Sequence, residues 1–499
     1  MDSSSDLYRH LRRYKLNSLL LSIGNITRQM MVNNQAILPI DVIREKGASQ
    51  RKNKFNLSAF HLSDLAYHAI QATNDFGKKQ PSFLDIITLC NEYIKHDEQK
   101  SAIEYNALQD SDFLIKVIVG LSQKQFPYQE TYRIRSEFNR QVEIIQEIPN
   151  KINSEFHFDD ICYQETGLSL SDLRAILFTL FTLNSNSSDL TAIILNEPLD
   201  HIHPALTTAN INRLIDYYSA NYSDFRTSKF SENHFRIKPI VRSSNNRLIV
   251  PDAFMLAMKM ADGPLWVIRN HFYNNKSNSF VIYFGYLFEK YIEDMIKSQL
   301  NKNQYYRIPE SNKRKRKDQR ADWIIYTTKY RIIIELKSSI ASMNIKQLYP
   351  DLEDIKKYIN RLFEAVSQLN TTEKDYPDSQ HQTIKILVHY ETLFFSDGTL
   401  RTFIIERNKE ILSNTNNIFF CDVGEFEWFI SVMGKSESEA ELIIDKKIET
   451  QHSPQEGIEF SQIIPRISKT GNTYNNQVLD HWGKHLPGLQ RPFSQLYPS

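Results

Sequence analysis

Cysteine is scarce in this chain of 499 residues, which contains only Cys90, Cys162 and Cys421. The three lie far apart and lack any paired spacing, so the sequence supports neither a disulfide framework nor a zinc site. Such usage fits the reducing cytoplasm, where we expect the protein to be located. The first residues, Met1 to Asp6, are polar and acidic, unlike a secretory signal peptide.

Long apolar runs and a large net charge are also missing. The longest apolar stretch, from Ala175 to Leu183, contains two threonines and is far too short to span a bilayer. The net charge is only +1, so we expect no overall electrostatic attraction to nucleic acid. Hydrophobic residues at 41% and charged residues at 24% are typical of an ordinary soluble protein without a membrane partner.

The length predicts two or three domains, because single hydrophobic cores seldom grow this large. Residues 1–232 are expected to form a domain for sensing, gating or oligomerisation that is helical from residue 7 to about residue 221. Residues 233–275 contain a predicted β-hairpin and a connecting segment, and residues 276–435 an α/β domain. Residues 436–499 are predicted to hold a helix and a proline-containing tail, which is either flexible or wraps a neighbour. The predicted fold class is therefore α+β.

Two β-branched and aromatic runs, 320–326 and 331–337, predict short buried strands. Side chains alternate between the two faces of a strand, so Glu335 and Lys337 share one face. Asp322 begins the preceding strand, and it comes beside them if the two strands pair as a hairpin. The sequence therefore predicts two carboxylates and a lysine at the rim of a sheet.

This set of side chains suits metal-dependent hydrolysis of phosphodiester bonds. Hard oxygen ligands favour Mg²⁺ or Mn²⁺ over Zn²⁺, and Mg²⁺ often uses only one or two carboxylates besides substrate phosphate. A lysine there orients the attacking water or offsets developing negative charge. The alternative interpretation is an exposed pair on an edge strand, since Glu-x-Lys is very common in strands.

Asp322, twelve intervening residues and then Glu335-Leu336-Lys337 resemble the signature of the PD-(D/E)xK nuclease superfamily, which has the restriction-endonuclease-like fold. The resemblance implies that Asp322 and Glu335 bind the metal ion, together with the peptide carbonyl of Leu336. It also implies that Lys337 positions the attacking water. The family core runs helix, three strands, helix, strand.

The surrounding sequence offers these elements in the same order. The predicted elements are a helix at 284–296, a strand at 304–309, the two motif strands, a helix from residue 350, a strand at 384–390, a helix at about 399–412, a strand at 418–423 and a helix at 425–433. The order αβββαβ, followed by αβα, matches the family core and a common extension of it.

One further carboxylate is predicted on the helix at 284–296. Glu289 follows Phe288 and lies one turn after Gly285, where another backbone can approach closely. Family members commonly show Gly-x-x-Phe-Glu at this place, so the resemblance implies that Glu289 is an additional or second-metal ligand. The alternative interpretation is a solvated residue on the flank of the helix.

Local charge differs from the overall balance. Residues 301–337 contain eleven Lys or Arg against four Asp or Glu. Five of these cations form one run, which consists of Lys313, Arg314, Lys315, Arg316 and Lys317. In a loop between the first two core strands, this run would lie beside the active site and hold the phosphate backbone of a nucleic acid. The alternative is a solvated loop without a role.

Two classes of function remain open. The first is a Mg²⁺- or Mn²⁺-dependent endonuclease acting on nucleic acid, with DNA favoured. A nuclease with a large helical companion resembles prokaryotic defence proteins, which implies action against phage or plasmid DNA and either self-association or a partner defence protein. The second class is a catalytically inactive nucleic-acid-binding or scaffold protein that retains the fold. The intact Asp322, Glu335 and Lys337 favour the enzyme.

Overall fold

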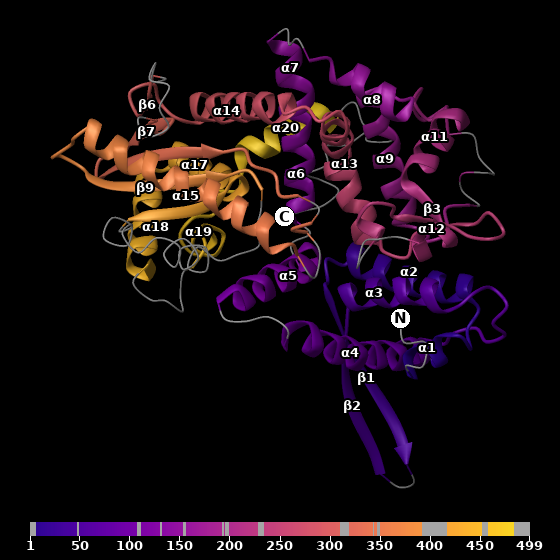
Figure 1. The fold of residues 1–499 in the computed structure, drawn as a ribbon. Coiled ribbons are helices and arrows are strands. Elements are labelled where there is room, and N and C mark those ends of the chain that lie inside the picture. Colours follow the sequence, from indigo (N-terminus) through magenta and orange to yellow (C-terminus); the bar gives the residue numbers. More distant parts are fainter. Residues whose placement is uncertain are drawn as a thin grey trace.

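The computed structural model describes most of the chain. The described residues are 6–46, 49–106, 111–129, 132–152, 156–191, 194, 199–227, 234–309, 319–342, 344–346, 350–391, 417–451 and 458–483. They form helices together with three sheets, of five, three and two strands. The fold is mixed α+β, as predicted (Figure 1).

The first part of the chain is largely helical. Its α-helices are α1 (Asp6–Leu11), α2 (Leu16–Val32), α3 (Ala59–Ala72), α4 (Phe83–Asn106), α5 (Ser111–Gln129), α6 (Tyr132–Val142), α7 (Ile148–Lys151), α8 (Phe158–Thr166), α9 (Leu170–Asn184), α11 (Thr208–Tyr218) and α12 (Tyr222–Thr227). A π-helical turn, Glu143–Glu147, joins α6 to α7. The apolar faces of α1 to α4 close a core of their own with strands from the three-stranded sheet.

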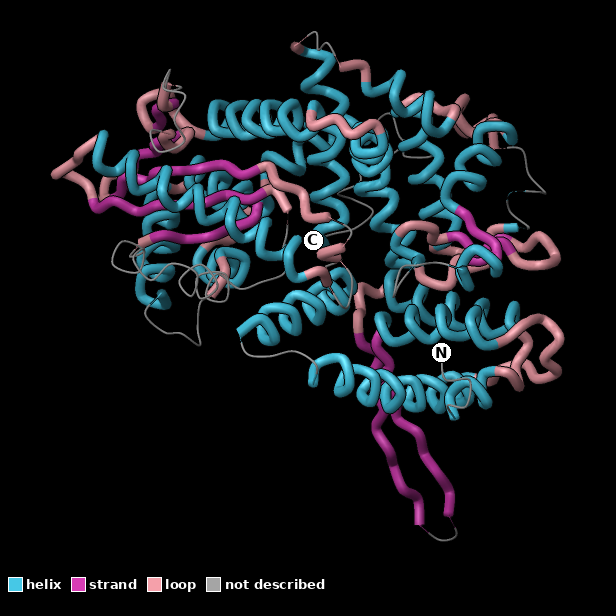
Figure 2. The backbone as a smooth tube through the Cα atoms, viewed as in Figure 1, coloured by secondary structure: helices cyan, strands magenta, loops and turns pink. Residues whose placement is uncertain are grey.

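A long β-hairpin lies between these helices, so the prediction that the chain is helical from residue 7 to about residue 221 is wrong for this segment. Strand β1 (Ile37–Lys46) pairs antiparallel with β2 (Ser49–Ser58) along its whole length. The reason lies in β1, where four β-branched residues fall between positions 37 and 43 and favour extended backbone over helix. The ribbon projects away from the layer of α1 to α4 (Figures 1 and 2).

The predicted hairpin in residues 233–275 is confirmed. Strand β4 (Ile240–Arg242) pairs antiparallel with β5 (Leu248–Ile249), and β3 (Ser219–Asn221) adds a parallel strand on the other side of β4. Asp252 then caps the long helix α13 (Ala253–Asn274), because its carboxylate accepts hydrogen bonds from the first backbone N–H groups.

The α/β part follows the predicted order of elements. Its elements are α14 (Ser279–Gln299), β6 (Tyr305–Arg307), β7 (Trp323–Tyr326), β8 (Tyr330–Lys337), α15 (Leu352–Asp375), β9 (Gln382–His389), β10 (Ile418–Asp422) and α17 (Val423–Lys435). The order αβββαβ is confirmed, whereas the helix predicted at about 399–412 lies outside the described residues. In the sheet the strands lie in the order β10-β9-β8-β7-β6, with β8, β9 and β10 parallel and β6, β7 and β8 antiparallel.

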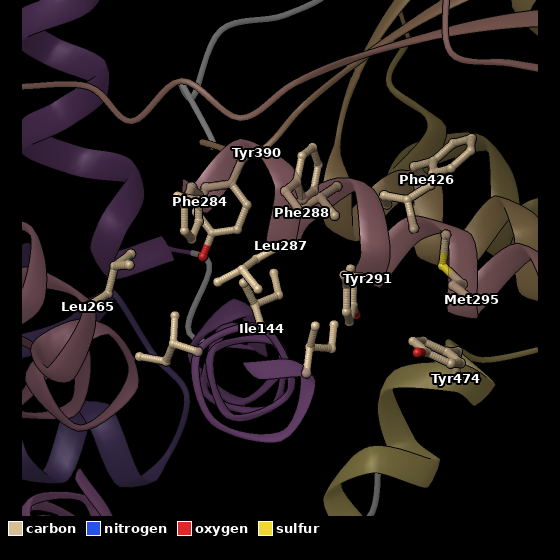
Figure 3. Close-up of a cluster of buried hydrophobic side chains, with 14 of the residues drawn as sticks. Ile144, Leu265, Phe284, Leu287, Phe288, Tyr291, Met295, Tyr390, Phe426 and Tyr474 are labelled. Carbon is tan, nitrogen blue, oxygen red and sulfur yellow. The ribbon is translucent and has the colours of Figure 1, made fainter. Parts of the chain in front are cut away.

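The two faces of this sheet belong to different cores. Ile332 and Ile334 of β8 pack in the core that contains the apolar face of α14, whereas Ile333 packs in the core that contains α15. Figure 3 shows Phe284 and Phe288 of α14 gathered near Tyr390, which follows β9. The sheet is therefore covered on both sides, as its apolar central strands require.

The last described helices pack on this core. They are α18 (Glu437–Gln451), α19 (Phe460–Ile467) and α20 (Thr473–Gly483). Phe460 and Tyr474 are buried in the core that contains α14. Glu427 of α17 lies at the junction of the two parts, because it pairs with Arg140 of α6 over 2.6 Å and accepts a hydrogen bond from Tyr291 of α14 over 2.7 Å.

Among the described helices, none is by itself long and apolar enough to cross a membrane. Helices α8 and α9 would meet the requirement of length and composition only as a pair, and they are bent by 59° relative to each other.

Candidate active site

The two motif strands pair as the sequence predicts. Strand β7 runs antiparallel to β8, with Trp323 opposite Ile334 and Tyr326 opposite Arg331. The connection is a tight turn in which the Thr327 N–H donates to the carbonyl of Tyr330 over 2.8 Å. Since Ile333 faces the core that contains α15, alternation places Glu335 and Lys337 on that same face.

Glu335 and Lys337 are in direct contact. Lys337 Nζ lies 2.5 Å from Glu335 Oε1. The same ammonium donates to Gln368 Oε1 on α15 over 2.6 Å. Sequence reasoning missed Gln368, because nothing in its local pattern indicates that this position of α15 lies over the end of β8. The lysine is thus held between a carboxylate of the sheet and an amide of the covering helix.

Asp322 lies beside the same pair. Its Oδ2 accepts a hydrogen bond from the backbone N–H of Leu336 over 2.8 Å, and its own N–H donates to the carbonyl of Ile334 over 2.9 Å. Leu336 is the residue between Glu335 and Lys337, so the Asp322 carboxylate is fixed at the rim where those two side chains stand. The expected convergence of two carboxylates and a lysine is present.

The carboxyl group of Glu335 is buried, with 3% of the residue exposed. Burial, together with the negative charge of Asp322, raises the pKa of Glu335 well above its ordinary value, and Lys337 only partly opposes this. Its second oxygen, Oε2, is buried without a hydrogen-bond partner. Unpaired buried acceptors are rare in folded proteins, and this oxygen has the capacity to accept a further partner.

Glu289 approaches the site from α14 on the outer side. Gly285, one turn earlier, allows α14 to come close to the residue after Lys337, since a Cβ on Gly285 would lie 3.3 Å from Ser338 Oγ. The Glu289 carboxylate is 38% exposed and lies 3.5 Å from Arg307. Its charge is near enough to contribute to the raised pKa of Glu335. Glu289 therefore flanks the Asp322–Glu335 pair.

The helical part of the chain borders the carboxyl ends of the parallel strands. Lys337, His389 and Asp422 occupy corresponding positions at the ends of β8, β9 and β10. Arg133 of α6 pairs with Asp422 across this edge. Sequence reasoning missed Arg133, because the two residues are 289 positions apart.

A cavity of about 120 Å³ lies at the same edge. Ile340 and Lys346, which follow β8, and Tyr390 and Glu391, which follow β9, line it from the sheet side. Residues of α5, α6 and α13, together with Arg236, complete its wall. Helices of the N-terminal part therefore lie against the strand ends where the candidate site is located.

A metal ion would not find a complete set of protein ligands in the described part of the chain. No group of three or more His, Cys, Asp or Glu side chains gathers there in a metal-binding arrangement. The candidate ligands are two carboxylates, Asp322 and Glu335, and the backbone carbonyl of Leu336. Such a sparse set suits Mg²⁺, which usually keeps several waters and binds substrate phosphate. The basic run Lys313 to Lys317 lies outside the described residues.

Comparison of this chain with known proteins identifies no similar protein. No protein-family model, no curated protein and no solved structure matches this chain.

Proposed function

We propose that this chain is a Mg²⁺-dependent endonuclease that hydrolyses phosphodiester bonds of nucleic acid, with DNA as the favoured substrate. The observation that carries the proposal is the buried, unpartnered Oε2 of Glu335, beside Asp322 and next to the ammonium of Lys337. The two crowded carboxylates repel one another, and Lys337 only partly offsets that repulsion. A divalent ion would relieve the rest of it and give Oε2 a partner.

The oxygen atoms available at the site fit the divalent metal ion that the proposal requires. Asp322, Glu335 and the carbonyl of Leu336 would hold the ion through oxygen atoms, which are the ligands that Mg²⁺ and Mn²⁺ prefer. When bound, the ion supplies Lewis-acid polarisation of the phosphate and lowers the pKa of a coordinated water. Glu289 would add a carboxylate at the outer edge, where it pairs with Arg307 in this structure.

Lys337 orients the attacking water and offsets the negative charge that develops on the phosphate. An ammonium group has three N–H donors. Glu335 and Gln368 accept hydrogen bonds from Lys337 Nζ, so a third N–H group can donate to the attacking water or to the phosphate. A lysine held on both sides keeps one geometry through the reaction, and such preorganisation is the larger part of electrostatic catalysis.

Substrate binding is assigned to the cations of one basic run. The run Lys313 to Lys317 joins β6 to β7 in the sequence, so it is proposed to hold the phosphate backbone as the strand passes Asp322. We place the activity in prokaryotic defence against phage or plasmid DNA, with a second copy or a partner defence protein, on the resemblance to such nucleases alone.

A cleavage assay tests the proposal. Purified full-length chain is incubated with supercoiled plasmid, linear duplex and single-stranded DNA, and with RNA, in Mg²⁺, Mn²⁺, Ca²⁺ or EDTA. We expect cleavage in Mg²⁺ and Mn²⁺, little turnover in Ca²⁺ because the larger ion relaxes the octahedral geometry, and none in EDTA. Cleavage that survives EDTA contradicts the metal-dependent mechanism. Nucleic-acid binding without cleavage under any of these conditions favours the inactive scaffold.

A further inference from the structure

The cavity between the helical part and the strand ends combines an apolar wall with charged side chains. Ile134 of α6, Leu265 of α13 and Ile340, which follows β8, contribute to the apolar wall. Its volume is about 120 Å³. A cavity of roughly 150 Å³ accommodates benzene, so the available space suits a ligand of about six to eight non-hydrogen atoms.

Three cations and three carboxylates also line the cavity. They are Arg133, Arg236, Lys346, Glu137, Asp262 and Glu391. Four of these six side chains already take part in ion pairs, which are Arg133–Asp422, Glu137–Arg140 and Lys346–Glu391. The other two, Arg236 and Asp262, are the charged groups of the wall that a ligand can engage.

Arg236 ends the short 3-10 turn His234–Arg236. Within the described part of the chain, its side chain donates to a single acceptor, the backbone carbonyl oxygen of Lys346. A guanidinium has five N–H donors in a planar fork that matches a carboxylate. Burial lowers the pKa of Arg236, and nearby acidic groups only partly oppose this effect. Arg236 therefore has N–H groups that can donate to an anionic group of a ligand.

Asp262 provides an acceptor on the α13 side of the cavity. Its Oδ2 accepts a hydrogen bond from the indole N–H of Trp266 over 2.8 Å. Its Oδ1 is buried and accepts no hydrogen bond from the described residues. Lys259 Nζ lies 3.9 Å from Oδ1, which is too far for a hydrogen bond. Asp262 Oδ1 can therefore accept from a cationic donor of a ligand.

We propose that this cavity binds a small α-amino acid with a short apolar side chain. Its carboxylate pairs with Arg236, its ammonium group donates to Asp262 Oδ1, and its side chain contacts the apolar wall. An anion without a donor would meet the negative charge of Asp262, and an amine without an acid group would meet the positive charge of Arg236. A zwitterion satisfies both groups at once.

This site adjoins the candidate active site but is separate from it. The backbone N–H of Tyr390, another lining residue, donates to the carbonyl of Lys337 over 2.9 Å. Neither Asp322 nor Glu335 lines the cavity. Amino-acid binding is therefore independent of the proposed nuclease function, and it can be measured without nucleic acid or metal.

Isothermal titration calorimetry of the full-length chain compares L-valine with two analogues that each lack one charged group. Isovalerate lacks the ammonium group, and isobutylamine lacks the carboxylate. We expect L-valine to bind and each analogue to bind at least about tenfold more weakly, because each leaves one polar group of the cavity without its partner. Absence of L-valine binding at millimolar concentrations overturns the proposal, as does equal affinity for L-valine and either analogue.

Two variants assign the charged groups of the ligand to their partners. Asp262→Asn should weaken L-valine binding at least about tenfold, because an amide group replaces the free carboxylate oxygen, and isovalerate should bind at least as well as before. Arg236→Gln should weaken L-valine binding by a similar factor and leave the affinity for isobutylamine unchanged. A general loss of structure would weaken all three ligands alike, so this crossed pattern distinguishes contact with the ligand from a structural role.

Arg242→Gln and Asp216→Asn are the matched controls, since these two residues pair with each other over 2.5 Å and do not line the cavity. Both should bind L-valine as the wild type does. Thermal unfolding checks the fold of every variant, and if Arg236→Gln does not fold, the comparison of L-valine with isovalerate in Asp262→Asn decides. Wild-type affinity for L-valine in Asp262→Asn, or equal weakening of L-valine and isovalerate, overturns the proposal.

Discussion

The carboxylate of Asp322 accepts a hydrogen bond from the backbone N–H of Leu336 over 2.8 Å, from one strand of a hairpin to the next. Because Leu336 stands between Glu335 and Lys337, this bond fixes one carboxylate beside the other at the rim of the sheet. It places the two acids close enough for Asp322 to raise the pKa of Glu335.

Replacing Lys337 should separate cleavage from binding. For Lys337→Ala we expect a loss of about 10²- to 10⁴-fold in the single-turnover rate with Mg²⁺, because the water loses its orienting group. DNA affinity should change little. Lys329→Ala is the matched control, since Lys329 lies at the turn before β8 and pairs with Asp445. A Lys337→Ala variant that cleaves at the wild-type rate contradicts the assigned role.

Two substitutions of Asp322 should differ in stability but agree in activity. Asp322→Asn keeps an oxygen that can accept from Leu336 N–H, whereas Asp322→Ala removes the acceptor and should cost about 1–2 kcal/mol in the free energy of unfolding. Both variants lose the carboxylate, so neither should cleave DNA in Mg²⁺. The measurements are urea unfolding in EDTA and plasmid cleavage. Retained activity in Asp322→Asn would remove Asp322 from the set of metal ligands.

Without metal, Glu335 should destabilise the fold as the pH rises. The pKa of Glu335 is raised in the folded state. Below about pH 4 the carboxyl group is therefore largely protonated in both the folded and the unfolded chain, and it does not lower the free energy of unfolding there. As the pH rises, the unfolded chain ionises first and the wild type loses stability. In EDTA, Glu335→Gln should therefore match the wild type at pH 4 and be more stable at pH 8, as measured by urea unfolding. Mg²⁺ at pH 8 should stabilise the wild type and leave Glu335→Gln unchanged. Identical stability of the two proteins at pH 8 would falsify this reading of the buried carboxyl group.

Gln368 should act through Lys337. In Gln368→Leu the ammonium loses an acceptor at 2.6 Å, and we expect the single-turnover rate to fall by about tenfold to a hundredfold through misplacement of Lys337. Gln368→Glu keeps the acceptor and should restore part of the rate, with a shifted pH profile. Ser367→Leu, at the adjacent exposed position of α15, serves as the control. If Gln368→Leu and Ser367→Leu behave alike, Gln368 has no positioning role.

The sequence predicted those parts of the site that depend on local pattern. Alternation along 331–337 was enough to place Glu335 and Lys337 on one face, and a tight turn was enough to bring Asp322 beside them. The order of elements from α14 to β10 followed from the same patterns. Gln368 was missed, because its contact depends on how α15 crosses the sheet, which periodicity does not encode.

Two further features could not be predicted from the sequence, for different reasons. The pairing of Arg133 with Asp422 joins residues 289 positions apart, and neither has a distinctive local pattern. The β1–β2 hairpin was not predicted, because helical patterns flank it on both sides. Its first strand nevertheless has a high strand propensity, with Ile37, Ile40, Val42 and Ile43 as β-branched residues.

The most direct measurement is Mn²⁺ binding to the full-length chain by isothermal titration calorimetry at pH 8, in the absence of nucleic acid. Burial raises the pKa of Glu335, so binding should release protons to the buffer to the extent that this carboxyl group is protonated before the ion binds. We expect a site that is present in the wild type and in Lys337→Ala and absent in Glu335→Ala and Asp322→Asn. Mn²⁺ binding that is unchanged in Glu335→Ala would show that the unpartnered Oε2 does not hold a metal ion, and the account of this site would be wrong.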